Sequence, residues 1–353
     1  MLLRDGLQLP LPKSISIWWN FGSLLGLSIV IQIASGIFLA IIYRGGEIGF
    51  DSLIHLIRDV PGGWMVRLIH CNGARIYFLL IYIHIGRALY YQRYATQPNS
   101  FIIGSAILIL RIAVAFLGYV LPWGQISYWG ATVITNLLRA VPIIGPRLVR
   151  WVWGGFAVSG YTLTRFYVLH FLGPFLIAGL SILHLYFLHF NGRTNPIGLI
   201  THYRKITFKP YFLYKDSITW IILVSIIFYT VIFIGYGLID PENFIIANRI
   251  STPAHIQPEW YFLFAYAILR SIPRKVGGVI GLISAVAILF IKPLILNSKN
   301  FPLSTSLRNQ ILVFLFFLSF IILTYIGAIP VESPYIFLSQ AFGVLYFIVF
   351  IFI

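Results

Sequence analysis

The sequence predicts an all-α polytopic membrane protein with eight transmembrane helices. Hydrophobic residues make up 59% of the 353 residues and charged residues only 10%, a balance that excludes an ordinary soluble globular chain. The apolar residues gather in runs of about twenty, the length that an α-helix needs to cross a bilayer. Strands of a membrane barrel would alternate over about ten residues, so the runs indicate helices.

Eight apolar runs define the expected spans. They lie near residues 21–43, 65–92, 101–121, 163–190, 217–236, 277–296, 309–329 and 335–353. No cleavable signal pattern precedes the first run, which we interpret as a retained span. Eight crossings leave six of the seven lysines on the N-terminal side, which favours the negative side of the membrane for that face. Lysines and arginines counted together are nearly even between the faces.

We expect two units: residues 1–205, a four-helix bundle of the first four spans, and residues 206–353, which hold spans five to eight. The single cysteine excludes disulfide frameworks and zinc or iron–sulfur sites built from this chain alone. The net charge of +16 is scattered between the spans, so it argues against nucleic acid and favours anionic lipid headgroups.

Two histidine pairs share one spacing inside predicted spans. His70 and His84 are 14 residues apart, as are His170 and His184. Fourteen helical residues place two imidazoles about 40° apart around the axis and roughly 21 Å apart along it. Two such helices could clamp two flat cofactors between them at two depths. A lone histidine on an apolar face is usually packing, but matched intervals on two helices favour haem ligands.

The predicted haems are b-type and non-covalently held, because the sequence contains no Cys-x-x-Cys-His attachment motif. The second and fourth spans run in the same direction, since one span separates them. We therefore expect His70 to pair with His170 near the positive side and His84 with His184 near the negative side.

Arginines and glycines surround the histidines in a regular way. Arg67 and Arg87 lie three residues outside the pair His70 and His84, where haem propionates would emerge, although arginines at helix ends also snorkel. Glycines repeat the 14-residue interval on the other two spans, where a bare backbone could approach a flat ring or simply pack helices: Gly22, Gly36, Gly104 and Gly118.

Three long motifs resemble the cytochrome b family, the membrane subunits of quinol–cytochrome c reductase (cytochrome bc complex, complex III). They are WWNFGS from Trp18, GYVLPWGQISYWGATVITN from Gly118, and PEWY from Pro258 with the run that follows it to Pro273. The resemblance extends from Ser16 to about Tyr346. Both halves lie on one chain, as in mitochondrial or proteobacterial members. The length, the hydrophobic bias and the lack of a signal favour the mitochondrial inner membrane over a bacterial plasma membrane.

The resemblance implies an activity and a set of partners. Quinol would be oxidised near the positive side, with one electron leaving to an iron–sulfur (Rieske) protein. The other would pass from a low-potential haem at His70 and His170 to a high-potential haem at His84 and His184, and reduce quinone near the negative side with coupled proton translocation. Ubiquinone as substrate, a cytochrome c-type subunit, accessory subunits, a homodimer and anionic lipids such as cardiolipin are implied as well.

The resemblance also implies two quinone pockets. At the outer pocket Glu259 would accept a proton and Tyr261 would supply a hydroxyl, with contributions from Tyr119, Tyr266 and Gly130. Taken alone, that glutamate could simply cap a surface helix. The inner pocket would use His189, Lys215 and Asp216, with Trp19, Asn20, Ser23 and Gly26 from the first span. Lys215 and Asp216 could instead be an interfacial anchor pair.

Two intramembrane arginines depart from the family pattern. Arg75 falls between the histidines of the second span, and Arg111 falls midway between the glycines of the third. A charge at that depth is costly unless it is paired or hydrated. Since the neighbouring spans offer no acid at that depth, we expect both to point into the bundle or a hydrated cavity, bond backbone carbonyls and raise a haem potential. A lipid or accessory-subunit contact is the rival explanation.

Two other functions remain to be distinguished. A transmembrane di-haem reductase fed by a cytosolic flavin would share the histidine pairs but has no need of the Glu259 motif. A transporter would show broken helices, intramembrane acids or an inverted repeat. A haem spectrum separates a transporter from both electron carriers.

Overall fold

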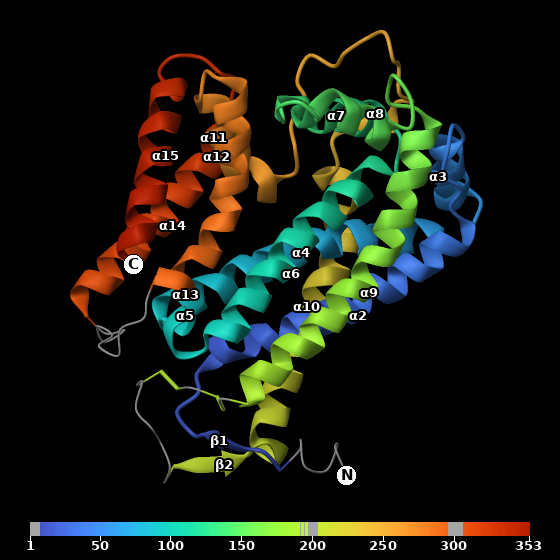
Figure 1. Ribbon diagram of the computed structural model, residues 1–353. Helices are drawn as coiled ribbons and strands as arrows, with labels where there is room; N and C mark the ends of the chain where they lie inside the picture. Colours follow the sequence, from blue (N-terminus) through green and yellow to red (C-terminus); the bar gives the residue numbers. More distant parts are fainter. Residues whose placement is uncertain (1–7, 191, 194, 197–203, 296–305) are drawn as a thin grey trace.

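The computed structural model describes residues 8–190, 192–193, 195–196, 204–295 and 306–353. Within these residues it contains eight helices long and apolar enough to cross a membrane, as predicted (Figure 1). They extend over Ile17–Ile42, Gly63–Tyr90, Pro98–Val120, Gly160–Phe190, Phe208–Leu238, Lys275–Leu294, Leu307–Gly327 and Tyr335–Phe352. The fifth begins well before its expected start, and residue 296, the expected end of the sixth, lies outside the described residues.

The first four spans form the predicted bundle. Its helices are α2 (Phe21–Ile42), α4 (Gly63–Tyr90), α6 (Pro98–Val120) and α9 (Gly160–Phe190). α2 packs along α4 and α6 packs along α9, while contacts of α2 with α9 and of α4 with α6 close the bundle (Figure 1).

The fifth span packs against α2 and α4. It starts with η3 (Phe208–Phe212), continues as α10 (Leu213–Tyr229) and ends in η4 (Thr230–Ile234) and η5 (Gly235–Leu238). At Gly235 the backbone takes a φ of +46°, which a residue without Cβ adopts at little cost, and η4 ends there and gives way to η5. The predicted boundary between residues 205 and 206 stays a prediction, but by its contacts this span forms a wall of the first bundle.

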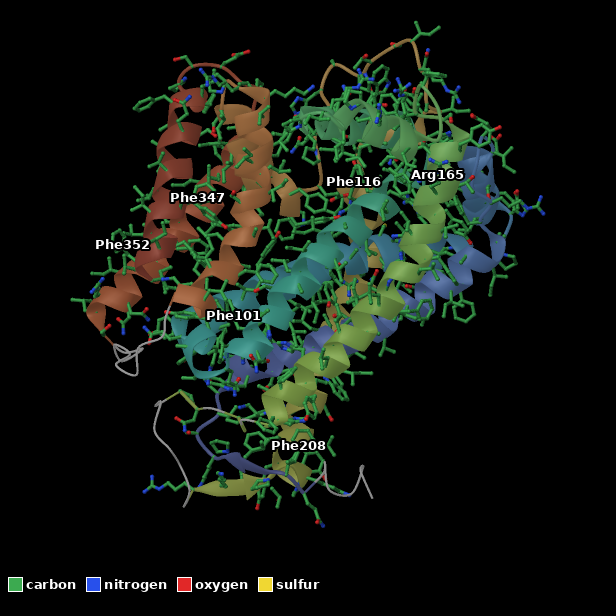
Figure 2. All side chains as sticks on the ribbon, viewed as in Figure 1. Phe101, Phe116, Arg165, Phe208, Phe347 and Phe352 are labelled. Atoms are coloured by element: carbon green, nitrogen blue, oxygen red, sulfur yellow. The ribbon has the colours of Figure 1, made fainter. Side chains whose placement is uncertain are left out.

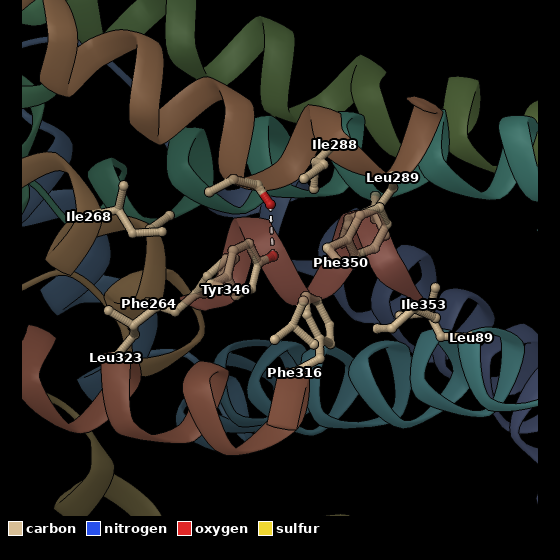
Figure 3. Packing of buried hydrophobic residues seen from close by; sticks show 14 of the residues in the cluster. Leu89, Phe264, Ile268, Ile288, Leu289, Phe316, Leu323, Tyr346, Phe350 and Ile353 are labelled. Atoms are coloured by element: carbon tan, nitrogen blue, oxygen red, sulfur yellow. Dashed lines mark hydrogen bonds between the residues drawn. The ribbon is translucent and has the colours of Figure 1, made fainter. Parts of the chain in front are cut away.

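The last three spans pack together around a short buried helix. That helix, α11 (Leu263–Ser271), contacts α12 (Lys275–Ala287), α14 (Leu307–Gly327) and α15 (Tyr335–Phe352), and α12 continues as η8 (Ile288–Phe290) and α13 (Ile291–Ile295). Figure 3 shows the apolar core between them, where the Tyr346 hydroxyl donates to the Ala285 carbonyl at 2.8 Å. α14 also contacts α4, which joins the two groups of helices.

Short elements that the apolar runs did not predict cover the ends of the bundle. η1 (Ile17–Asn20) begins the first span. The other short elements are α3 (Gly49–Arg58), α5 (Arg93–Thr96), α7 (Gln125–Asn136), η2 (Leu137–Ala140), α8 (Gly145–Trp153), η6 (Pro241–Phe244) and η7 (Trp260–Phe262). α7 and α8 lie across one end of the bundle in Figure 1. At the other end, β1 (Pro10–Pro12) pairs antiparallel with β2 (Lys205–Thr207).

The outer faces of the spans are apolar. Figure 2 shows side chains such as that of Phe352, which is 58% exposed, on the outside of the helices. Exposed side chains of this kind continue along α9 and α10. Such faces suit a hydrocarbon environment, because lipid tails impose no cost on exposed apolar surface.

We expect Gly327→Ala to destabilise the contact of α14 with α11. A Cβ at Gly327 would lie 2.3 Å from the backbone oxygen of Leu263, an atom that cannot move without shifting a helix. Overpacking of this kind costs about 1–3 kcal/mol. The matched control is Gly343→Ala on α15, where the nearest atom is the Ile268 side chain at 3.8 Å. The midpoint temperature of thermal unfolding, measured in detergent, should fall for Gly327→Ala only. Equal midpoints for the two variants would contradict this account.

Candidate functional site

The four histidines with the 14-residue interval lie in two facing pairs, as the parallel direction of α4 and α9 requires. The ring centroids of His70 and His170 are 6.0 Å apart, and those of His84 and His184 are 6.3 Å apart. Two metal–nitrogen bonds of about 2 Å each, with the half-widths of two imidazole rings, add up to about 6 Å. Each pair is therefore spaced as two axial ligands of one metal would be.

Hydrogen bonds fix the orientation of three of these rings. His170 Nδ1 lies 2.8 Å from the Val114 carbonyl and His184 Nδ1 lies 2.8 Å from the Ser100 carbonyl. His70 bonds the Gln32 backbone and lies 2.9 Å from the Ser35 hydroxyl. A proton held on Nδ1 leaves the Nε2 lone pair free for a metal.

His84 is oriented differently from the other three histidines. Its Nδ1 lies 3.1 Å from Nη2 of Arg87, one turn along the same helix. Since a guanidinium can only donate, this nitrogen accepts the hydrogen bond. The His84 ring must give up this bond to present Nε2 to a metal in the same way as its partner His184.

Each of the four predicted glycines packs against one histidine. Cβ atoms built on Gly36 and Gly118 would lie 3.0 and 2.3 Å from Cε1 of His70 and His170, and those on Gly22 and Gly104 would lie 3.5 and 3.1 Å from Cε1 of His84 and His184. The flat ring that the bare backbone accommodates is thus the imidazole. Gln32, Ser100 and Val114, which bond the rings, each precede the paired glycine by four residues, one helical turn.

One cavity of about 210 Å³ opens beside the first histidine pair. It is lined by His70, His170, Gly36 and Gly118, and it continues to Glu259, Tyr261 and Tyr119. Arg67 also lines it, and its Nη1 is buried without a hydrogen-bond partner. An unsatisfied guanidinium beside two facing imidazoles fits a haem with anionic propionates. At the second pair, the buried Nε of Arg87 likewise has no partner.

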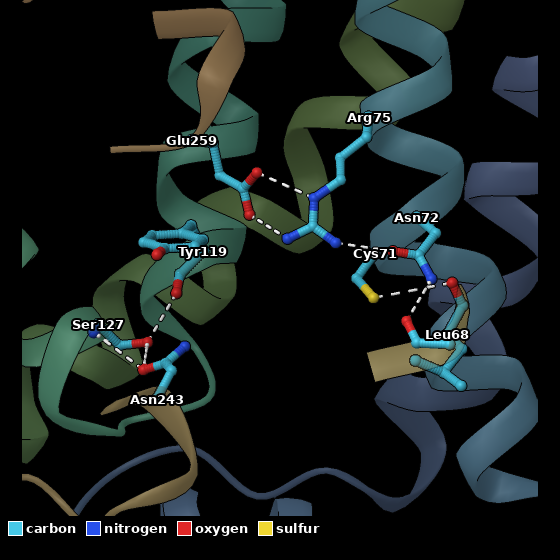
Figure 4. Close-up of polar contacts among 9 residues, drawn as sticks. Leu68, Cys71, Asn72, Arg75, Tyr119, Ser127, Asn243 and Glu259 are labelled. Carbon is cyan, nitrogen blue, oxygen red and sulfur yellow. Dashed lines mark hydrogen bonds and ion pairs between the residues drawn. The ribbon is translucent and has the colours of Figure 1, made fainter. Parts of the chain in front are cut away.

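Glu259 is held by Arg75, and this overturns one sequence expectation. Nε and Nη2 of Arg75 donate to the two carboxylate oxygens at 2.9 and 2.5 Å, while Nη1 donates to Asn72 Oδ1 at 2.7 Å (Figure 4). We expected Arg75 to lack an acid at its depth and to bond carbonyls. The acid comes from the loop before η7 and not from a neighbouring span, so inspection of the spans could not find it.

The remaining outer-pocket residues divide into two groups. Tyr261 stacks on Phe78 with centroids 3.9 Å apart, its carbonyl accepts from Tyr82, and burial raises the pKa of its hydroxyl well above the ordinary value. Tyr119 lines the cavity, and its carbonyl accepts from Ser127 at 2.8 Å. Gly130 and Tyr266 do not line this cavity, and the Tyr266 ring lies against the Arg270 guanidinium.

The predicted inner-pocket residues gather where α2 begins. The Asn20 amide donates to the Lys215 carbonyl at 3.1 Å, and Ser23 bonds the buried Asp216 carboxylate. Lys215 Nζ donates to the Ile15 carbonyl at 2.7 Å, so its charge is directed at backbone.

Arginines complete this region. The Trp19 ring lies 5.4 Å from the Arg87 guanidinium and 5.5 Å from that of Arg93. His189 is exposed near the end of α9, and Arg193 acts electrostatically on both His189 and Asp216. A Cβ on Gly26 would meet open space.

Sequence reasoning missed several residues that organise these sites. Asn72 orients Arg75 and also donates to the Gly235 carbonyl at 3.1 Å, and Arg193 adds a positive charge near Asp216. For the backbone partners of the histidines a signal exists, because each lies one turn before a paired glycine. Asn72 lies three residues before Arg75 on one helix, a spacing that could have indicated this contact. The Gly235 carbonyl and Asp216 lie on distant segments, so no spacing rule connects them to Asn72 and Arg193.

We expect Arg75→Leu to destabilise the protein. It would leave the Glu259 carboxylate buried and unpaired, and removing one partner of a buried ion pair costs about 3–5 kcal/mol. The double variant Arg75→Leu, Glu259→Leu removes both charges. Its midpoint temperature of thermal unfolding in detergent should recover most of the decrease seen in the single variant. If the single variant unfolds at the same temperature as the unaltered protein, the ion pair does not contribute to stability.

Comparison with known proteins assigns these features to one family. Residues 7–192 match the family model described as cytochrome b/b6/petB, and residues 246–347 match the one described as cytochrome b(C-terminal)/b6/petD. The chain is 52% identical over 346 residues to a cytochrome b of Albinaria caerulea, an alignment that covers 98% of this chain and 94% of that protein.

A solved structure shows the same architecture. A chain of a hyperthermophilic respiratory Complex III superimposes with a TM-score of 0.92 at 30% sequence identity, covering 99% of this chain and 94% of that one. The match includes both groups of helices described above.

Proposed function

This chain belongs to the cytochrome b family, and from that premise we propose that it is the di-haem electron-transfer subunit of a quinol–cytochrome c reductase. The family implies b-type haem and quinone binding, and the structural match implies a multisubunit respiratory complex. The observation that carries the di-haem assignment is the pair of histidine pairs, each about 6 Å between ring centroids.

The chain's own residues would hold the two haems. His70 with His170, and His84 with His184, would supply the nitrogens that hold one haem each, and the glycines opposite them let the helices approach closely. Arg67 and Arg87 offer guanidinium groups to propionates. Bound in these positions, the haems would carry electrons one at a time along the bundle axis.

The outer pocket supports quinol oxidation. Glu259 presents a carboxylate to the cavity that also contains Tyr261 and Tyr119. A carboxylate can accept a proton from a quinol hydroxyl, but here both oxygens already accept from Arg75. Glu259 must therefore give up part of this ion pair when it takes the proton. The buried Tyr261 hydroxyl stays protonated and can donate a hydrogen bond to the substrate.

The inner pocket supports quinone reduction. Asp216, which bonds Ser23, offers a carboxyl near the start of α10, and His189 offers an imidazole near the end of α9. Both groups can supply protons to a quinone that is being reduced. Lys215 donates to backbone and would serve as an anchor for this end of α10.

We propose further that the chain works in the mitochondrial inner membrane as a multi-pass protein, with a Rieske protein, a cytochrome c-type subunit and accessory subunits in a homodimeric complex. Ubiquinone is the proposed substrate, and anionic lipids such as cardiolipin would meet the scattered basic residues. Neither the flavin-fed reductase nor the transporter is favoured by any observation.

A redox-titrated optical spectrum of the purified complex tests this function. We expect two b-type haems of separate potential, reduced by quinol in a manner that an outer-pocket inhibitor blocks. In His84→Leu one haem should be lost and the other kept, because the two pairs are separate. One haem or none in the unaltered complex would contradict the di-haem assignment.

Substitution of the glycines by alanine should lower haem content more where the added Cβ lies closer to the histidine ring. A Cβ at Gly118 would lie 2.3 Å from the His170 ring, so Gly118→Ala must displace that ring and should lower haem content at the first pair. Gly22→Ala is the matched control, since its Cβ would make an ordinary contact with His84 at 3.5 Å. Haem-to-protein ratios and low-temperature spectra measure the effect. Equal loss in both variants would show that the ring contacts do not matter.

A further inference from the structure

Arg111 lies midway between the two histidine pairs. It is seven residues from both Gly104 and Gly118, and Tyr77 is seven residues from both His70 and His84. Seven helical residues rise about 10 Å and return almost to the same face. The guanidinium carbon of Arg111 lies 3.8 Å from the centroid of the Tyr77 ring. A cation stacked on an aromatic ring thus occupies the interval between the proposed haems.

This cation is buried and has no acidic partner. Arg111 is 7% exposed, and its Nε has no hydrogen-bond partner. The three ion pairs among the described residues are His55–Asp59, Arg75–Glu259 and Arg249–Glu47, so none involves Arg111. Arg75 is neutralised by Glu259, whereas no acid within the described part of the chain pairs with Arg111. Its burial also argues against the lipid or accessory-subunit contact considered above.

The Arg111 guanidinium is placed unequally with respect to the two histidine pairs. Arg111 lines the cavity that contains His70 and His170. The cation at the second pair is Arg87, whose Nη2 lies 3.1 Å from His84 Nδ1. Both Arg67 and Arg111 border the cavity of the first pair, but only Arg111 lies in the interval between the two pairs.

We infer that Arg111 raises the reduction potential of the haem between His70 and His170 and so narrows the potential step between the two haems. Reduction adds one negative charge to the haem, and a nearby cation in a medium of low dielectric constant stabilises that added charge. Tyr77 is a positioning residue, because its ring holds the guanidinium in the interval. The inference rests on the proposed di-haem function and adds a determinant of the energy of electron transfer.

The test is a potentiometric titration of both haems in the assembled complex. In Arg111→Leu we expect the midpoint of the His70/His170 haem to fall by more than that of the His84/His184 haem, so that the two midpoints move apart. Arg111→Lys keeps the charge and should retain most of the original separation. Arg58→Leu removes an exposed cation from α3 and should leave both midpoints unchanged.

A second neutral variant keeps the test decisive if Arg111→Leu prevents assembly of the complex. Arg111→Gln keeps polarity and much of the side-chain volume, and it should reproduce the wider separation. An unchanged separation in both neutral variants, or equal shifts of both midpoints, would overturn the inference while leaving the di-haem function intact. Loss of haem in both neutral variants but not in Arg111→Lys would assign Arg111 a structural role and would also overturn it. The absence of two haems in the unaltered complex would reject the proposed function itself.

Discussion

The contact between an imidazole ring and a bare helix backbone is the constraint on which the rest of the bundle depends. Each of the four paired histidines of α4 and α9 lies against a glycine of α2 or α6, and three of them donate to a carbonyl one turn before that glycine. The interval between the two contact residues is 14 residues on all four helices. Once one histidine ring lies against its glycine, the second histidine of that helix is therefore aligned with the second glycine. The same contacts therefore set helix spacing, helix register and ring orientation.

Charge in a low-dielectric interior is the second constraint. The bundle buries Arg67, Arg75 and Arg111, and the only acid that pairs with any of them among the described residues is Glu259. A buried cation without a partner is unfavourable unless something anionic binds beside it. This imbalance fits a protein completed by a cofactor that carries carboxylates, and it explains why the guanidinium groups border the cavity.

The sequence predicts the parts of this structure that follow from local periodicity. Apolar runs predict the eight spans, and the interval between His70 and His84 predicts a pairing that needs only parallel helices. Amphipathic segments such as α7 and α8 lack a long apolar run, so they were missed. The ion pair of Arg75 with Glu259 joins residues 184 positions apart and depends on the path of a loop. No spacing rule predicts that contact, nor the hydrogen bond from Asn72 to the Gly235 carbonyl, whose residues are 163 positions apart.

The place of the fifth span has a consequence for how the chain can be divided. α10 follows the connector after α9 but packs on α2 and α4, and β2 of that connector pairs with β1 near the N-terminus. A break in the backbone within this connector would therefore leave both fragments held together by a helix face and a two-stranded strap. Packing on the bundle and strand pairing, and not the continuity of the backbone alone, hold the two parts of the chain together at this position.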